Sequence, residues 1–294
     1  MVRNTRSLVY FNDRLVRYLF IASAVMVSLI ILSIIWFVGN QGLATFKEAS
    51  VVQFFTSSKW SPDNGKFGAL TFIAGTLGTT LIAIVLGAPL GLAGAIFMAR
   101  IAPKWMRTIM RPAVELFAGI PSVVYGYVGI TVLVSILRKT TGSATGYGLL
   151  AGGIVLAVMI LPTVTSISED TLRALPESYE EASLALGATR WQTIWRVLVP
   201  AAAPGILTAI ILAMARAIGE TMAVQMVIGN APLFPNTLVT PTSTLTSDIV
   251  MEMGNTPFGS TWNNALFMMA LILLVVSLLL IILVRMAVRK GAKA

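Results

Sequence analysis

Six long and nearly uncharged apolar stretches limit what this sequence can fold into. They cover residues 19–38, 72–99, 115–137, 147–168, 204–228 and 265–284. A helix of about 20 apolar residues spans the hydrocarbon core of a membrane. A chain in lipid must also satisfy its backbone hydrogen bonds internally, and a helix does so. The sequence therefore predicts an all-α membrane protein with six transmembrane helices that contact lipid.

Composition supports this class and excludes others. Hydrophobic residues make up 56% of the chain and charged residues 11%, against about 25% charged residues in soluble domains. The chain has no cysteine and no histidine, which excludes disulfides and metal sites built on thiolate or imidazole. No metal site is predicted. The net charge of +9 comes from clusters at the ends of apolar stretches, so no nucleic-acid partner is predicted.

The distribution of basic residues predicts the topology. If both termini face the cytoplasm, fifteen Lys and Arg residues lie on the inner side and five on the outer side. Inner loops of membrane proteins carry the excess of Lys and Arg, so both termini of this multi-pass membrane protein are predicted to be cytoplasmic. The first apolar stretch exceeds the 7–15 residues typical of a cleavable signal peptide and is interpreted as a retained helix.

A two-part organisation follows from this topology. Residues 1–66 are predicted to form an N-terminal cytoplasmic arm, the first transmembrane helix and the first periplasmic loop. Residues 67–294 are predicted to form a core of five transmembrane helices.

Residues 176–200 are polar in an otherwise apolar chain. Three acidic residues, Glu177, Glu180 and Glu181, follow Pro176, and acids are favoured in the first turn of a helix by its dipole. Gly187 is predicted to end this helix.

An apolar face remains on the same helix. Tyr179, Ala182 and Leu186 recur at a helical spacing, which predicts a small face that fits a groove. Thr189 is predicted to cap a second helix beginning at Arg190. That helix is predicted to bend or stop at Pro200 and Pro204.

The spacing of these residues resembles a known motif. Glu181-Ala182-Ser183, Gly187 and residues 197–200 (VLVP) are similar to the E-A-A-x3-G-x9-I-x-L-P loop of binding-protein-dependent ABC import permeases. The resemblance implies the type I ABC importer permease fold, with a coupling helix seated in a cleft of an ABC ATPase dimer. Contacts to that ATPase would come from Glu177, Glu180, Glu181, Ala182, Leu186 and Gly187. An ordinary surface helix between two membrane spans is the alternative.

Arg216 lies in the middle of the fifth apolar stretch. An arginine near the centre of a bilayer costs about 2.5–3.5 kcal/mol on insertion scales, so it is expected to face a bundle interior or water. Glu220 follows at i+4 and is predicted to pair with it, and Thr221 adds polarity. The planar guanidinium matches an oxyanion with two hydrogen bonds. A salt bridge that fixes helix packing is the alternative.

Two further segments resemble phosphate ABC permeases of the PstC type. These are residues 217–224 (AIGETMAV), followed by VIGN, and residues 118–126 (AGIPSVVYG). In that family the arginine and glutamate of the fifth-helix signature lie on the phosphate path, which implies this role for Arg216 and Glu220. The hydroxyl of Ser122 is a further candidate for the lining.

The resemblance also implies the bacterial cell (inner) membrane as the location, and it implies the partners. These are a second permease subunit of the PstA type, an ABC ATPase dimer that binds ATP and Mg²⁺, and a periplasmic phosphate-binding protein docked on loops including residues 230–264. The chain would form half of the translocation pathway, bind no cofactor and catalyse no reaction.

Three other functions were considered. A permease for another oxyanion, such as phosphonate, molybdate or sulfate, fits the same arginine. An intramembrane enzyme using Glu115, Glu220 or a serine would lack a usual base or metal set. In a secondary carrier, the acidic helix would have no purpose. Glu115 is otherwise interpreted as a helix-dipole partner or a contact of the Arg107 and Arg111 loop.

Overall fold

The computed structural model describes residues 3–291, with side chains described for residues 16–282 and 284–286. In this part of the chain six helical segments are long and apolar enough to cross a membrane. They are Val16–Lys47, Leu70–Ile101, Ser122–Thr141, Leu149–Ala174, Arg190–Gly219 and Thr261–Met286. The prediction of six such helices is confirmed. Several basic residues used to predict topology lie outside the described side chains: Arg3, Arg6, Arg14, Arg289, Lys290 and Lys293.

The elements follow one another as a helical chain with one small hairpin. The long helices are α1 (Arg3–Ala44), α3 (Leu70–Ile96), α4 (Lys104–Gly119), α7 (Leu149–Ala174), α10 (Val199–Gly219) and α13 (Thr261–Gly291). The short ones are α2 (Val51–Thr56), α5 (Ser122–Val128), α6 (Val134–Thr141), α8 (Ser178–Ala185), α9 (Arg190–Thr193), α11 (Met222–Ile228) and α12 (Leu245–Glu252). π-Helical turns occupy Phe97–Ile101, Gly129–Leu133 and Ile194–Leu198. Strands β1 (Trp60–Ser61) and β2 (Lys66–Phe67) pair antiparallel.

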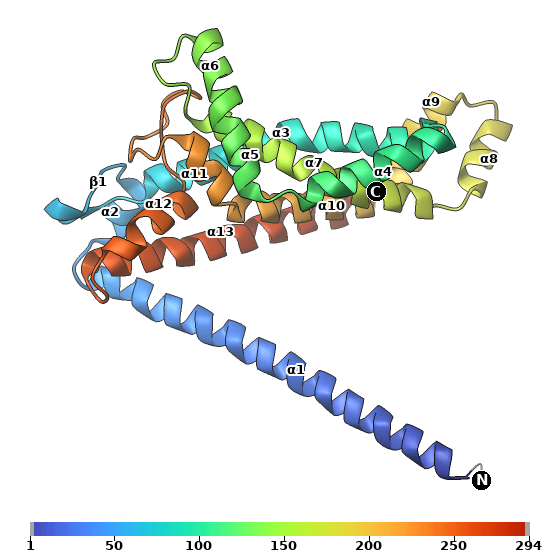
Figure 1. The fold of residues 1–294 in the computed structure, drawn as a ribbon, viewed down its shortest axis with the longest axis horizontal. Coiled ribbons are helices and arrows are strands. Elements are labelled where there is room, and N and C mark those ends of the chain that lie inside the picture. The colour runs from blue at the N-terminus through green and yellow to red at the C-terminus, as the bar shows by residue number, and fades with distance from the viewer. Residues whose placement is uncertain (1–2, 292–294) are drawn as a thin grey trace.

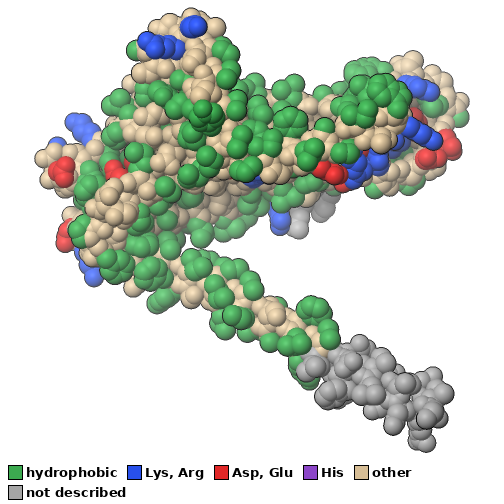
Figure 2. All heavy atoms as spheres, viewed as in Figure 1, with side chains coloured by type: hydrophobic (Ala, Val, Ile, Leu, Met, Phe, Trp, Pro, Cys, Tyr) green, Lys and Arg blue, Asp and Glu red, His purple; other side chains and the backbone are tan. Residues whose placement is uncertain are grey.

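Most helices gather in an elongated bundle, from which α1 diverges (Figure 1). Helices α4, α8 and α9 lie at one end, and the hairpin, α2, α6 and α12 lie at the other. Helix α1 approaches α13 near Gly42, where an added Cβ would lie 2.9 Å from the Met268 Cα. The side chains of residues 16–37 are exposed and mostly apolar (Figure 2). Such a surface suits lipid or another membrane subunit.

Small residues allow α3 and α7 to pack closely in the centre of the bundle. A Cβ added at Gly87 would lie 2.9 Å from the carbonyl oxygen of Ala157, and one at Gly91 would lie 2.8 Å from the Cβ of Val164. The Thr165 hydroxyl donates a hydrogen bond to the Gly91 carbonyl at 3.1 Å. This close packing supplies van der Waals contact where lipid offers no hydrophobic drive between helices.

The third span begins at Ser122, so the prediction that it begins at residue 115 is wrong. The backbone is extended at Ile120 and Pro121, which ends α4 and starts α5. Proline lacks an amide hydrogen and disfavours helical conformation in the residue before it, so the break follows from Pro121. Glu115 therefore does not open a span. It lies on α4, where its carboxylate accepts a hydrogen bond from Arg111 at 3.3 Å.

The fifth span differs from its prediction, residues 204–228, at both ends. A helical segment, Arg190–Gly219, continues through Pro200 and Pro204, which were predicted to bend or stop it. Pro200 lies in the first turn of α10, directly after a π-helical turn. The wider π geometry offers room for a ring that clashes with the carbonyl four residues earlier in an α-helix. At its C-terminal end the helical segment stops at Gly219 instead of residue 228, because the backbone at Glu220 is extended.

Residues 230–264, predicted to be a long polar loop, fold partly into the bundle. Residues 242–248 are all buried. A capping box formed by Thr244 and Ser247 starts α12, and the Leu245 amide donates to the Thr76 hydroxyl of α3 at 3.0 Å. Only the remaining parts of this segment are available to an external partner.

Candidate functional site

Helix α8 covers most of the segment predicted to bind an ATPase. The helix starts at Ser178, two residues after the predicted Pro176, although the Tyr179 amide already bonds to the Pro176 carbonyl at 3.2 Å. Gly187 follows the helix with a φ of +84°, a left-handed conformation that glycine adopts without steric cost. The predicted stop is confirmed. No residue of α8 is buried, so the helix stands at the surface.

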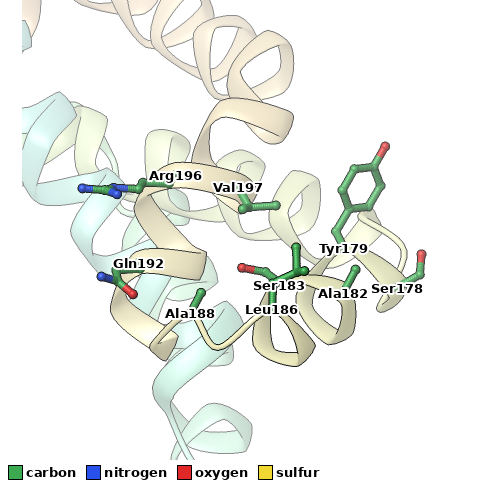
Figure 3. Close-up of a pocket in the computed structure, with 9 residues that line it drawn as sticks. All are labelled: Ser178, Tyr179, Ala182, Ser183, Leu186, Ala188, Gln192, Arg196 and Val197. Carbon is green, nitrogen blue, oxygen red and sulfur yellow. The ribbon is translucent and has the colours of Figure 1, made fainter.

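A groove of about 700 Å³ runs between α8 and the helical turns that follow it. Its lining residues are Ser178, Tyr179, Ala182, Ser183, Leu186, Ala188, Gln192, Arg196 and Val197 (Figure 3). The predicted apolar face of Tyr179, Ala182 and Leu186 thus lies on one wall. Leu186 is 90% exposed, which leaves a large apolar side chain open to a partner at this end of the molecule.

The three acids of this segment do not share one environment. Glu177 and Glu181 are exposed. Glu180 instead pairs with Arg100, whose Nη1 lies 3.0 Å from the carboxylate. Charged side chains gather around α4, α8 and α9, whereas apolar side chains dominate the rest of the visible face (Figure 2). This end of the bundle therefore carries charged side chains around a groove whose own wall is partly apolar.

Helix α8 is also joined to the helix that follows it. The Gln192 amide donates to the Thr189 hydroxyl at 3.3 Å, and the Thr189 amide donates to the Gln192 side chain at 2.9 Å. The predicted Thr189 cap is confirmed. The Ser183 and Thr193 hydroxyls lie 3.0 Å apart and share a hydrogen bond. Since Thr193 lies in the first turn of the helical segment Arg190–Gly219, displacement of α8 can act on the fifth span.

Arg216 lies in the last turn of α10, and its side chain is exposed. The carbonyl pole of a helix favours a positive charge there. Among the residues whose side chains the structure describes, no carboxylate lies within ion-pairing distance of the guanidinium. The charge is neither sealed in packing nor neutralised within this part of the chain.

The predicted pairing of Glu220 with Arg216 is wrong. Helix α10 ends at Gly219, so Glu220 no longer lies one turn above Arg216 on a shared face. Its carboxylate instead accepts a hydrogen bond from the Ala223 amide at 3.3 Å and so satisfies one free N–H in the first turn of α11. Thr221 bonds to the Gly219 carbonyl at 3.3 Å. Both candidate pathway residues therefore belong to the helix break.

The break in the third span lies beside the break in the fifth. A Cβ added at Gly126 of α5 would lie 3.0 Å from the Ala223 Cα of α11, and one at Gly129 would lie 2.8 Å from the Val227 side chain. Ser122 is half-buried in the first turn of α5. The structure thus brings the neighbourhoods of Ser122, Glu220 and Thr221 together, which sequence spacing does not indicate.

Two residues of α12 support this region and were not predicted. The Thr246 hydroxyl donates to the carbonyl of Glu220 at 3.0 Å, which satisfies a backbone group freed by the break. Asp248 is 6% exposed. Burial, and to a smaller extent the nearby Glu252, raises the pKa of Asp248 to about 8. The signal in the sequence is a pair of acids, Asp248 and Glu252, in a long segment without Lys or Arg.

In the described part of the chain, no cluster of three or more acidic residues could hold a metal ion. The chemistry of the two regions is therefore that of charge, hydrogen bonding and shape. One region offers an exposed guanidinium beside two helix breaks, and the other offers a surface helix and groove.

Residues 91–292 match the family model described as the inner membrane component of binding-protein-dependent transport systems. The chain belongs to this family. Its members are permease subunits that transport rather than catalyse, and this permease has the type I ABC importer fold.

Relatives at higher identity cover most of this permease. It is 52% identical over 253 residues to the probable ABC transporter permease protein YqgH of Bacillus subtilis, with 85% of this chain and 82% of the relative covered. It is 36% identical over 298 residues to the phosphate transport system permease protein PstC of Mesorhizobium japonicum, with 92% and 90% covered.

A solved structure shares the fold of this permease. The crystal structure of a bacterial alginate ABC transporter in complex with a periplasmic protein contains a chain that matches with a TM-score of 0.62 at 16% identity. The match covers 92% of this permease and 96% of that chain.

Proposed function

We propose that this permease imports inorganic phosphate as one half of an ATP-driven translocation pathway. Several relatives named phosphate transport system permease protein PstC support this, at 30–36% identity over most of the chain. The other half would be a second permease of the PstA type. An ABC ATPase dimer would bind ATP and Mg²⁺, and a periplasmic phosphate-binding protein would deliver the anion.

The observation that carries the proposal is the exposed Arg216 beside the break at Glu220. Phosphate is an oxyanion, and a guanidinium binds its oxygens with charge-assisted hydrogen bonds. Thr221 and Ser122, at the starts of the adjoining short helices, would add donors to the path. Glu220 accepts a hydrogen bond from the Ala223 amide and forms no ion pair with Arg216, which leaves the guanidinium donors available to an anion.

The surface helix α8 would connect ATP hydrolysis to this path. Closure of the ATPase dimer would draw together α8 of this permease and its counterpart in the second subunit. Leu186 and the exposed acids Glu177 and Glu181 would contact the ATPase cleft. The contact must differ in free energy between the inward-open and outward-open states, since a partner shifts an equilibrium only by its differential affinity.

We expect Arg216→Ala to abolish phosphate uptake. The loss should be at least about tenfold, because a hydrogen bond to a charged group contributes about 1.5–3 kcal/mol. Labelled phosphate uptake by the complex reconstituted in proteoliposomes measures it. Arg216→Lys should retain only part of the uptake, because the ammonium lacks the planar fork.

The matched control is Arg138→Ala, which removes an exposed arginine from α6 and should leave uptake unchanged. Co-purification of the ATPase subunit checks that each variant assembles. Normal phosphate uptake by assembled Arg216→Ala would contradict the role in the path. Uptake of sulfate, molybdate or phosphonate in place of phosphate by the wild type would assign the permease to another oxyanion.

A further inference from the structure

We propose that Arg100 is a positioning residue that ties α8 to α3 and α7, so that α8 moves with these two helices during transport. The inference rests on the proposed function, because it concerns how motion at α8 reaches the membrane helices. It starts from a single guanidinium that contacts three elements of the fold.

Arg100 lies in the π-helical turn that extends α3, and its side chain is only 13% exposed. Its Nη1 lies 3.0 Å from the Glu180 carboxylate on α8. Its Nη2 donates to the Leu172 carbonyl on α7 at 2.6 Å. One rigid, planar group therefore joins the ends of three helices.

The Leu172 contact has a clear physical basis. Leu172 lies in the last turn of α7, where carbonyl groups lack a partner within the helix. A guanidinium there satisfies one of these carbonyls and lies at the negative pole of the helix dipole. The Arg100 guanidinium has further N–H donors that bind the Glu180 carboxylate. A lysine ammonium would instead place one point charge between this carboxylate and the Leu172 carbonyl.

The other attachments of α8 are few. No residue of α8 is buried, and Gly187 at its end has a left-handed backbone. The Ser183–Thr193 hydroxyl contact joins it to the following helix. On the side facing α3, the described side chains offer one ion pair, Arg100–Glu180. Without that pair α8 could shift against α3 while the ATPase still held it.

The tie predicts a specific defect, in which ATP hydrolysis continues but drives less transport. Glu180→Gln removes the charge, and Arg100→Lys removes the double contact. In the reconstituted complex we expect Arg100→Lys, which leaves the surface of α8 unchanged, to hydrolyse ATP at close to the wild-type rate. The ratio of phosphate imported to ATP hydrolysed should fall at least about fivefold, the lower range of couplings between sites.

The matched control is Glu115→Gln. It also removes the acid of an Arg–Glu pair, Arg111–Glu115, but that pair lies within α4 and does not reach α8. Its transport ratio should equal that of the wild type. If Glu180→Gln leaves the ratio of phosphate imported to ATP hydrolysed unchanged, or if the ATPase is lost from that complex, the proposed role of Arg100 is wrong. A wild-type complex that imports no phosphate would contradict the proposed function instead.

Covalent rescue gives a second test. The chain contains no cysteine, so Arg100→Cys combined with Glu180→Cys can be bridged by a short bifunctional thiol reagent in a complex whose other subunits lack cysteine. We expect the double variant to be uncoupled before bridging and to regain most of its transport ratio afterwards. If bridging leaves it uncoupled, or stops transport, α8 does not move with α3 and the inference fails.

Discussion

Three charged residues in this permease occupy different environments. Arg100 is largely buried and contacts two acceptors at once. Arg216 is exposed at the end of α10. Asp248 is buried, and one of its carboxylate oxygens has no hydrogen-bond partner in the described part of the chain. A buried unpaired carboxyl avoids the cost of desolvation by remaining protonated.

Asp248 should make the stability of the permease depend on pH. Burial raises its pKa to about 8, whereas an aspartate in an unfolded chain titrates near 3.9. Between about pH 4 and pH 8 the folded state holds a proton that the unfolded state has released. The free energy of unfolding should therefore fall as pH rises through this window, by up to about 1.4 kcal/mol per pH unit.

Asp248→Asn, which cannot titrate, should remove most of this dependence. Thermal unfolding followed by fluorescence of the 6 tryptophans at about pH 6 and pH 8 measures the effect. Asp63→Asn, an exposed aspartate in the hairpin turn, serves as the control and should keep the wild-type pH dependence. Equal pH dependence in both variants would show that Asp248 does not titrate in this window.

At the scale of the elements, interrupted helices distinguish the third and fifth spans from the others. Pro121 carries a sequence signal for its break because proline cannot continue the hydrogen-bond ladder. The break at Glu220 has no proline. It is supported by the Thr246 hydroxyl of α12 and by the Ala223 amide, which compensate for lost helical bonds. Pro200, by contrast, does not interrupt its helix, because the π-helical turn at Ile194–Leu198 directly before it leaves room for the proline ring.

Close packing of α3 on α7 should be sensitive to a single methyl group. We expect Gly87→Ala to lower the free energy of unfolding by about 1–3 kcal/mol, as overpacking does, because the new Cβ would lie 2.9 Å from the Ala157 carbonyl oxygen. Gly39→Ala, where nothing lies within 4 Å, should be neutral. The temperature of unfolding in detergent measures both, and equal values would contradict the packing argument.

At the scale of the whole molecule, charged side chains lie mainly at the two ends of the bundle (Figure 2). Arg and Glu side chains cluster around α4 and α8 (Figure 2), and the hairpin, α6 and α12 lie at the opposite end (Figure 1). The excess of Lys and Arg in the segments assigned to the inner side predicts that the α8 end faces the cytoplasm. The binding protein would then approach the hairpin end.

Labelling of single cysteines tests this orientation in a chain that has none. In sealed right-side-out vesicles, a membrane-impermeant maleimide should modify Lys139→Cys, at the end of α6, from outside. Ser178→Cys, at the start of α8, should react only after permeabilisation. The reverse pattern would place α8 outside and exclude its contact with a cytoplasmic ATPase.

The division of the chain into an N-terminal part, residues 1–66, and a core, residues 67–294, stays a prediction.

Local physical chemistry was enough to predict several features of this permease. Apolar length predicted the six spans, and the spacing of the acids and Gly187 predicted α8. Each of these features depends on residues that are neighbours in the sequence or on the mean hydropathy of a continuous segment.

Tertiary structure decided where the charged groups find their partners. Glu220 caps α11 instead of pairing with Arg216, Glu180 reaches Arg100, and α12 folds in beside the break. The contacts of Glu180 with Arg100 and of Thr246 with Glu220 join residues far apart in the sequence. The Glu220 cap is local, but it forms because α10 ends at Gly219. A charge in a low-dielectric bundle takes whichever partner the packing brings near it.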